Sequence, residues 1–382
     1  MSCRYLKIED FCSTGSGGTP SRSKPEYYEG GDIPWIKSGD LKDSKIYEAN
    51  EYITAAGLEN SSAKIVEKDS ILIAMYGATV GRLAILGINA ATNQAICNIR
   101  PDTTIADMKY LYYFLKSKFS YFVENAVGGA QPNISQGLIK SLEVPLPSLD
   151  EQKRIADILD KAAGVCQKRE QAIKLADDFL RAKFLEMFGT PANNIHRFPK
   201  GTIRDLVDSV NYGTSAKASI DSGEYPILRM GNITYQGRWD FTDLKYLDLS
   251  VKEKDKYLVK EGDLLFNRTN SKELVGKTAV YEEDRPMAFA GYLIRVRPNS
   301  IGNNYYISGY LNSIHGKITL MNMCKSIVGM ANINAQELQN IEILIPPKHL
   351  QDEYEIIYKK IKKGLSIYDK SAMQLQLLAS NL

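Results

Sequence analysis

The sequence predicts an α+β protein in which one mixed α/β domain occurs twice, each copy followed by a long helix. The same order of motifs appears twice, at a period near 195 residues. Each copy mixes short apolar runs with Gly- and Pro-rich turns, which is typical of strands joined by loops. Each copy then ends in a long proline-free stretch with apolar residues at heptad spacing, which favours a helix.

The repeat is clearest at the end of each domain. Residues 128–159 read GGAQPNISQGLIKSLEVPLPSLDEQKRIADIL, and residues 328–358 read VGMANINAQELQNIEILIPPKHLQDEYEIIY. Upstream, IKSGDL at 36–41 aligns with LRMGNI at 228–233. Solenoid repeats are only ~20–50 residues long. We therefore interpret the pattern as a duplicated domain.

Composition is that of an ordinary globular protein. Hydrophobic residues make up 44% and charged residues 24% of the 382 residues, which fits two or three domains. No apolar run approaches the ~20 residues of a membrane span. The start, MSCRYLKIEDF, lacks the apolar core of a secretory signal. The expected location is the cytoplasm, with no membrane partner.

Cysteine and histidine spacing argues against metal-binding and disulfide-rich classes. The cysteines lie far apart and form no CxxC pair, which suits a reducing compartment. The histidines are equally scattered, so we expect no metal site. The residues concerned are Cys3, Cys12, Cys97, Cys166, Cys324, His196, His315 and His349.

Charge is nearly balanced, with a formal net charge of +3 and no basic tail. Composition alone does not point to DNA. A nucleic-acid partner would require folding to gather positive charge on one face.

Four segments follow from these patterns, with boundaries at 1–148, 149–189, 190–348 and 349–382. The first and third are the mixed domains, in which we expect Trp35 and Trp239 to be core anchors. The expected strands are 70–76, 95–99, 263–267 and 292–296, and the expected domain helices are 107–124 and 304–321.

The second and fourth segments are expected to be long helices. About forty residues at ~1.5 Å each form a rod of ~60 Å. Each apolar stripe could pack on its own domain, but two matched rods are best covered by each other. Flanking aromatics suggest either contact with a partner or packing on the adjacent domain; they are Phe179, Phe184, Phe188, Tyr354 and Tyr358. The stripe residues are Ile155, Leu159, Ala162, Cys166, Ile173 and Leu180 in the first helix and Ile357, Ile361, Tyr368 and Leu375 in the second.

These motifs together resemble the specificity subunit of Type I restriction–modification systems. The resemblance covers essentially the whole chain and is most specific at 131–159. It also rests on GGTPSRSKPEYYEGGDIPWIKSGDL (17–41), LIAMYGATVGRLAI (72–85), ATNQAIC (91–97) and MFGTP (187–191). The second repeat departs from these strings, with NYGTSAKAS in place of GGTPSRSKP and FNRTNSKELVGK in place of AMYGATVGR.

The resemblance implies an architecture and a function. Each repeat would be a target recognition domain followed by a conserved helix. The two helices would pack as an antiparallel coiled coil with pseudo-two-fold symmetry, holding the domains apart. Each domain would read one half of a bipartite site in double-stranded DNA. Two methyltransferase subunits and restriction (motor-nuclease) subunits would be partners that use S-adenosylmethionine, ATP and Mg, while this chain would be non-catalytic and hold no cofactor.

Base reading needs guanidinium, ammonium, amide and hydroxyl groups on loops that approach a groove. Candidates in the first domain are Ser21, Arg22, Lys24, Lys37, Tyr76, Thr79, Arg82, Gln94 and Gln131. Candidates in the second are Lys217, Arg229, Arg238, Arg268, Asn270, Lys272, Lys277 and Tyr292. Any one of them could instead be a solvated charge or could stabilise its own loop.

The alternative is a self-contained nuclease or methyltransferase with a duplicated recognition module. A nuclease could use Asp32, Asp43 and Lys45, but the second repeat has no counterpart. An adenine methyltransferase needs an Asn/Asp-Pro-Pro-aromatic loop to hold a flipped base, and Pro346-Pro347 lacks both ends of that motif. The run Gly276-Lys277-Thr278 lacks the preceding glycine of a P-loop.

Overall fold

The computed structural model describes residues 4–129, 131–271, 274–327 and 330–380, and the side-chain surroundings of all of these except 325–327, 330 and 366–380. The chain divides into two compact units. Unit 1 contains residues 1–166 and 374–382, and unit 2 contains residues 167–373. The four-segment division predicted above stays a prediction, because this boundary falls inside both long helices. Each unit therefore includes part of each helix.

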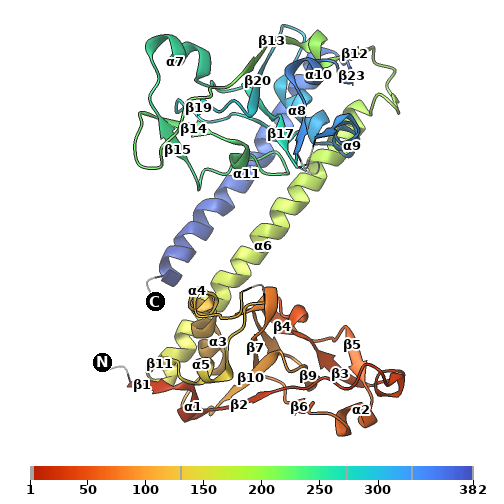
Figure 1. Cartoon of the computed structure of the whole chain (residues 1–382). Helices are drawn as coiled ribbons and strands as arrows, with labels where there is room; N and C mark the ends of the chain where they lie inside the picture. Colours follow the sequence, from red (N-terminus) through yellow and green to blue (C-terminus); the bar gives the residue numbers. More distant parts are fainter. Residues whose placement is uncertain (1–3, 130, 272–273, 328–329, 381–382) are drawn as a thin grey trace. The chain divides into compact units, whose positions relative to one another are not determined.

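Unit 1 contains two larger sheets and a two-stranded pair (Figure 1). The five-stranded sheet has the order β2 (Cys12–Ser16), β10 (Ile96–Pro101), β7 (Ile71–Ala74), β8 (Leu83–Leu86), β4 (Ser44–Ile46). The four-stranded sheet has the order β5 (Glu51–Ile53), β3 (Ile33–Ile36), β9 (Ala90–Thr92), β6 (Ile65–Val66). The pair joins β1 (Arg4–Lys7) to β11 (Glu143–Leu146). The shorter helices are α1 (Ile8–Phe11), α2 (Ala55–Glu59), α3 (Met108–Ser117), α4 (Phe119–Glu124) and α5 (Gln136–Lys140).

Unit 2 repeats most of this arrangement. One sheet has the order β13 (Val207–Tyr212), β20 (Leu293–Pro298), β16 (Leu264–Asn267), β18 (Thr278–Val280), and a second has the order β15 (Lys245–Leu247), β14 (Tyr225–Leu228), β19 (Ala288–Phe289). A third joins β17 (Thr269–Asn270), β22 (Met330–Asn332) and β21 (Lys325–Ile327), and β12 (Lys200–Thr202) pairs with β23 (Glu342–Leu344). The shorter helices are α7 (Val251–Tyr257), α8 (Asn304–Asn312), α9 (Ile314–Met323) and α10 (Ala335–Gln339).

Matching strand pairings confirm the duplication. The run β2–β10–β7–β8 in unit 1 has the same order and antiparallel sense as β13–β20–β16–β18 in unit 2. Each unit also has one parallel pair of strands in a second sheet. The pair β3 and β9 forms the centre of the four-stranded sheet of unit 1, and β14 pairs with the edge strand β19 in unit 2. The carboxyl ends of two parallel strands lie at one edge, so the loops that follow them emerge together.

An equivalent glycine in each unit lets the chain cross this edge. A Cβ at Gly17 would lie 1.9 Å from the Thr92 carbonyl oxygen, and one at Gly213 would lie 2.3 Å from that of Phe289. Only glycine fits so close to a neighbouring backbone. The loops after β2 and β13 are thereby brought beside the ends of β9 and β19.

The two predicted core anchors are confirmed. Trp35 is buried and its indole N–H donates to the Gly18 carbonyl at 3.0 Å. Trp239 packs against a core cluster of unit 2 and donates to the Val280 carbonyl at 2.7 Å.

The predicted strands are confirmed within a few residues, but each predicted domain helix is two helices. The stretch 107–124 breaks at Lys118 into α3 and α4, and 304–321 breaks at Ser313 into α8 and α9. Ser313 has an extended backbone and its hydroxyl accepts from the Gly316 N–H at 3.1 Å, which caps a new helix. The apolar periodicity continues across both breaks, so the sequence pattern did not reveal them.

The two long helices are confirmed as α6 (Leu149–Phe188) and α11 (Lys348–Ser380). Gly189 follows α6 with φ of 67°, the left-handed conformation that commonly ends a helix. Along the predicted stripe Ala162 is buried, whereas Ile155, Leu159, Cys166, Ile173, Leu180, Ile357 and Ile361 are partly buried. Tyr368 and Leu375 belong to α11, and their side chains lie outside the described residues.

Four of the five flanking aromatic residues pack on their own unit. Phe184 and Phe188 of α6 and Tyr354 of α11 are buried in the main core of unit 2, and Tyr358 packs against that core. These four therefore cover their own unit rather than a partner. Phe179 remains 49% exposed. Among the described residues, no helix is long and apolar enough to cross a membrane.

Candidate nucleic-acid interface

Unit 2 contains an open cavity of about 1020 Å³ beside the ends of β14, β16 and β19. Five of the predicted DNA-contacting residues line it, although they are far apart in sequence. They are Arg229, Arg268, Asn270, Lys277 and Tyr292. Folding thus gathers in one place a set of donors that composition alone did not reveal.

Arg268 is held firmly in this cavity. Its backbone N–H donates to the Tyr292 carbonyl at 3.0 Å, and its own carbonyl accepts from the Ile333 N–H at 2.9 Å. Its guanidinium carbon lies 4.8 Å from the centre of the Tyr212 ring, within cation–π range.

Lys277 follows a tight turn at Gly276, whose φ is 77°. The side chain is almost wholly buried, and burial lowers the pKa of Lys277. Arg82 occupies the equivalent place in unit 1, because it follows Gly81, whose φ is 80°. The Gly81 N–H donates to the Ala74 carbonyl, and the Gly276 N–H donates in the same way to the Asn267 carbonyl. Arg82 is exposed and lines a hollow with Lys42, Asp43 and Lys116.

Arg229 and Lys37 are also equivalent, each following the central parallel strand of its sheet. Arg229 is tied to Asp243, donating to the carboxylate at 2.8 Å and to the backbone carbonyl at 2.9 Å. Lys37 pairs with Glu51, which also binds Arg22 at 2.6 Å. Hydrogen bonds from Lys37 and Arg22 lower the pKa of Glu51.

The remaining candidates of unit 1 lie on neighbouring loops. Tyr76 is 46% exposed, and its backbone forms a β-bridge with Asn133. Gln131 precedes Asn133 by two residues in the chain. The Thr79 hydroxyl donates to the Tyr76 carbonyl at 3.1 Å. Gln94 accepts a hydrogen bond from Thr19. The other two are Ser21, in contact with the Ser23 hydroxyl, and Lys24, which donates to Tyr27.

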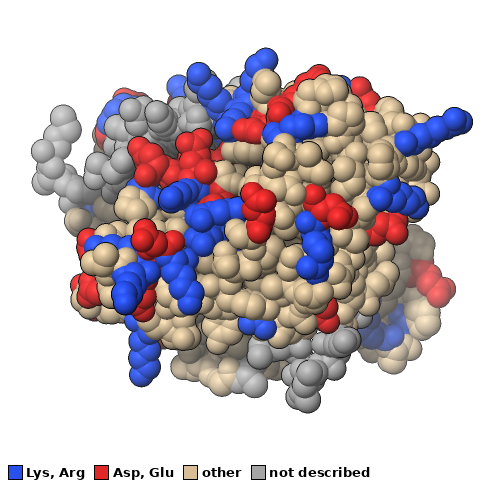
Figure 2. All heavy atoms as spheres, turned by 90° about the horizontal axis from the view of Figure 1, so that it is seen from above, with Lys and Arg blue, Asp and Glu red and all other residues tan. Residues whose placement is uncertain are grey.

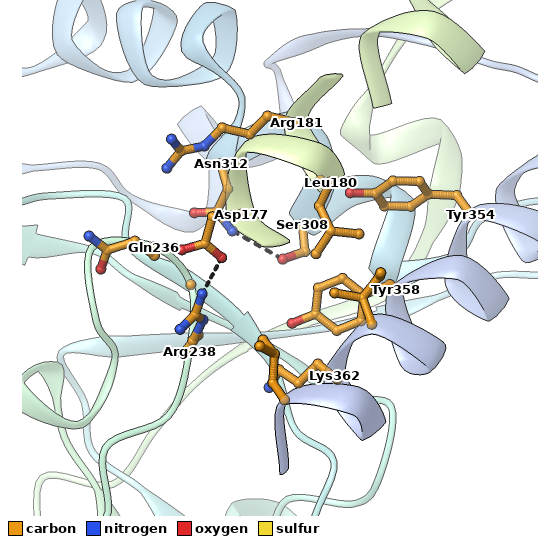
Figure 3. A pocket seen from close by; sticks show the side chains of 14 residues that line it. Asp177, Leu180, Arg181, Gln236, Arg238, Ser308, Asn312, Tyr354, Tyr358 and Lys362 are labelled. Carbon is orange, nitrogen blue, oxygen red and sulfur yellow. Dashed lines mark hydrogen bonds and ion pairs between the residues drawn. The ribbon is translucent and has the colours of Figure 1, made fainter. Parts of the chain in front are cut away.

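Arg238 lies away from the cavity of unit 2. Its guanidinium pairs with Asp177 of α6 and donates to the Ile173 carbonyl at 3.2 Å. Figure 3 shows Arg238 pointing toward Asp177 in a small pocket that Tyr358 of α11 also lines. Arg238 therefore contacts the part of α6 that belongs to its own unit. Lys217 is exposed on the loop after Gly213, and Lys272 lies outside the described residues.

Sequence reasoning missed several residues of the cavity. Lys245, Ser215 and Asn332 line it, and Tyr212 positions Arg268 from outside the lining. The substitution of NYGTSAKAS for GGTPSRSKP was a signal for Tyr212 and Ser215. Lys245 sits in a strand without any local motif, and only the pairing of β14 with β15 places it here.

One face of the molecule carries charges of both signs. On the face seen in Figure 2, lysine and arginine side chains are interspersed with aspartate and glutamate. The candidate interface is defined by the groups that line the cavity of unit 2. Among the described residues, no cluster of three or more His, Cys, Asp or Glu side chains could hold a metal ion.

Comparisons with known proteins agree with this division into two repeats. The family model of the Type I restriction modification DNA specificity domain matches the chain twice, over residues 4–175 and 198–379. The EcoR124I/EcoR124II specificity subunit of Escherichia coli is 33% identical over 150 residues, covering 38% of this chain and 37% of that relative. The MjaIX specificity subunit of Methanocaldococcus jannaschii is 24% identical over 396 residues, covering 97% of this chain and 89% of the relative.

Solved structures show the same fold. The S subunit of a Type I restriction–modification system from M. genitalium superposes with a TM-score of 0.63 at 15% identity, covering 100% of this chain and 95% of that one. A chain from a study of the assembly and conformational transition of the type I R-M system has a TM-score of 0.52 at 16% identity, covering 99% and 95%. The chain therefore belongs to the family of Type I restriction–modification DNA specificity proteins, with one specificity domain in each repeat.

Proposed function

We propose that this chain selects the DNA sequence on which a Type I restriction–modification complex acts, each unit reading one half of a bipartite site. The observation that carries the proposal is the double match to the DNA specificity domain, on two units with the same strand pairing. The DNA between the two halves would remain unread.

Differences at equivalent positions favour two unlike half-sites. Lys37 corresponds to Arg229, and exposed Arg82 corresponds to nearly buried Lys277. Gln94 lies where unit 2 has Gly291, because the flanking residues make matching backbone hydrogen bonds. Since base recognition depends on the donors and acceptors presented, one scaffold with different side chains would recognise different bases.

We further propose that α6 and α11 form an antiparallel coiled coil along their length and that this pair holds the two readers apart. Within unit 2 the two helices already run in opposite directions. Phe188 packs on Tyr354, while Leu180 lines a pocket with Ile361 farther along α11. An antiparallel pair would relate the repeats by an approximate two-fold axis, matching the symmetry of DNA strands.

Catalysis would then belong to partners. Two methyltransferase subunits would dock on this chain and use S-adenosylmethionine, and restriction subunits would use ATP and Mg. Loops that carry guanidinium and amide groups suit the recognition of DNA bases. Under this proposal the chain itself catalyses no reaction.

Methylation mapping tests the proposal. Cells lacking other methyltransferases would express the chain with the methyltransferase subunit from the same source, and methylated adenines would be located by single-molecule sequencing. We expect a motif of two unlike halves around a fixed unread spacer. Cells with the methyltransferase alone are the control and should show no such motif. An undivided motif, or methylation by this purified chain alone with S-adenosylmethionine, would contradict the proposal.

A further inference from the structure

We propose that Arg268 reads a guanine in the half-site recognised by unit 2. This inference rests on the proposed function and assigns one base to one side chain. It is carried by the fixed position of Arg268, its uncommitted donors and the cavity that it faces.

The backbone of Arg268 is fixed between two strands. Its N–H and C=O are both engaged, with Tyr292 on one side and Ile333 on the other. The residue therefore stays in place when its side chain is exchanged, and the side chain starts from one defined point of the cavity wall.

The side chain is held by an aromatic ring that is itself positioned. The guanidinium carbon of Arg268 lies over the Tyr212 ring, 4.8 Å from its centre, at the end of β13, and the Tyr212 hydroxyl accepts from the Ala335 N–H at 2.9 Å. A guanidinium held in contact with a ring has fewer conformations to lose on binding, which favours a specific contact.

Among the residues that the structure describes, the Arg268 side chain makes no hydrogen bond or ion pair. Its Nε is buried and has no hydrogen-bond partner among the described residues. Two other arginines of unit 2 have carboxylate partners. Arg229 pairs with Asp243 at 2.8 Å, although its Nε is also buried without a hydrogen bond, and Arg297 pairs with Asp263 at 2.7 Å. A buried donor without a partner is costly, so the arrangement suits a ligand that brings acceptors.

The chemistry of that ligand follows from the shape of the fork. In the major groove guanine presents two adjacent acceptors, N7 and O6, whereas adenine presents one acceptor and one donor. The arginine guanidinium has donors only, so two of its N–H groups can donate to guanine N7 and O6 together. At adenine, one of these donors would face the amino group, which is also a donor. Lys277 lines the same cavity and adds a second cation that favours acceptors. A DNA phosphate is the competing acceptor, and it would carry no sequence information.

The test uses the full chain in complex with its methyltransferase and duplexes that carry the mapped site. Each guanine of the site is replaced in turn by 7-deazaguanine, which lacks N7. We expect one substitution to weaken binding by the wild-type complex on the order of 10-fold and to leave binding by the Arg268→Ala complex unchanged. Arg268→Lys keeps the charge but loses the planar fork, so the same 7-deazaguanine substitution should weaken binding less than it does for the wild type.

Arg285→Ala is the matched control. Arg285 also lies over a ring, 5.0 Å from the centre of Phe241, but it does not line the cavity. Its complex should respond to 7-deazaguanine like the wild type.

The inference is overturned if no 7-deazaguanine substitution distinguishes wild type from Arg268→Ala. It is also overturned if Arg268→Ala weakens binding equally for all sequences while Arg268→Lys restores it, because that is the behaviour of a phosphate contact. Either result leaves a bipartite methylation motif intact, so a failure of this inference is distinguishable from a failure of the proposed function.

Discussion

Met75 and Arg268 occupy the same backbone position in the two repeats. Met75 donates to the Ala95 carbonyl at 2.8 Å and accepts from the Ile134 N–H at 2.9 Å, as Arg268 does with Tyr292 and Ile333. Met75 is only 4% exposed and belongs to the main core of unit 1, whereas Arg268 faces a cavity. The two repeats thus share one backbone position, which holds a core residue in unit 1 and a hydrogen-bond donor in unit 2.

Truncation at these two positions should therefore change the free energy of unfolding by very different amounts. Met75→Ala removes buried apolar volume and should lower the free energy of unfolding by about 2–5 kcal/mol. Arg268→Ala should change it by less than about 1 kcal/mol, because the substitution removes the contact with Tyr212 but, among the described residues, no ion pair and no part of an apolar core. Urea denaturation measures both, with Met321→Ala as an exposed control. Comparable destabilisation by the two substitutions would contradict the assigned difference.

Two buried glutamines, Gln152 and Gln351, fix the start of each long helix. The Gln152 amide accepts from the Asp107 N–H at 2.9 Å and donates to the carbonyls of Ile105 and Pro147. Gln351 donates to the carbonyls of Ile301 and Pro346 at 2.9 and 2.8 Å.

Replacing Gln152 with methionine keeps its size but leaves three backbone groups without partners. We expect a loss of about 1–3 kcal/mol in the free energy of unfolding. Lys153→Met, at an exposed neighbouring position, should be nearly neutral. Equal stability of the Gln152 and Lys153 variants would show that the amide does not secure the helix.

The ion pair between Asp177 and Arg238 should couple the 234–239 loop to α6. Their side chains are only 16% and 22% exposed. A double-mutant cycle with alanine at each position should give a coupling energy of about 1–3 kcal/mol in unfolding experiments. The pair of Arg181 and Asp178, at 3.7 Å and more exposed, is the comparison and should give less than about 1 kcal/mol. A weaker coupling for Asp177–Arg238 than for that pair would refute the prediction.

Lys317 should make stability depend on pH. Burial lowers the pKa of Lys317 to about 8, and the charges of Arg181 and Lys277 act in the same direction. The folded chain thus holds this proton less tightly than the unfolded chain, whose lysines titrate near about 10.4. The contribution of Lys317 to the free energy of unfolding therefore rises with pH, between about 8 and about 10.

Lys317→Met should remove that rise. Urea midpoints measured from about pH 7.5 to about pH 10 would show a shallower curve for the variant than for wild type. Lys252→Met, at an exposed position, serves as the control and should follow the wild type. Parallel curves for wild type and Lys317→Met would contradict the assignment.

Local sequence patterns predicted the duplication and both long helices because these depend on short-range rules. Pro147 and Gly189 bracket α6, and an uninterrupted periodicity between them is sufficient evidence for a helix. The break at Lys118 was missed because the apolar stripe of 107–124 continues through it. The sequence could not show that Phe184 and Tyr354 pack in one core, since that contact depends on how two distant helices meet.

The candidate site divides in the same way. Arg268 and Asn270 were predicted from residue type and loop context, and the fold brings them together with Arg229 and Lys277. Arg238 has the same residue type and a similar loop context, yet it pairs with Asp177. Residue chemistry thus indicates which side chains could bind DNA, while packing decides which donors remain free.

If α6 and α11 hold the two readers at a set distance, then lengthening both helices should lengthen the unread spacer. The most direct test inserts one heptad into each helix, at Cys166–Gln167 and at Met373–Gln374, where the two units meet in sequence. Seven residues lengthen a helix by ~10 Å, which corresponds to ~3 base pairs of DNA. Methylation mapping should return both half-sites unchanged with a longer spacer between them. An altered half-site, or the original spacer despite both insertions, would show that the two helices do not set the distance between the readers.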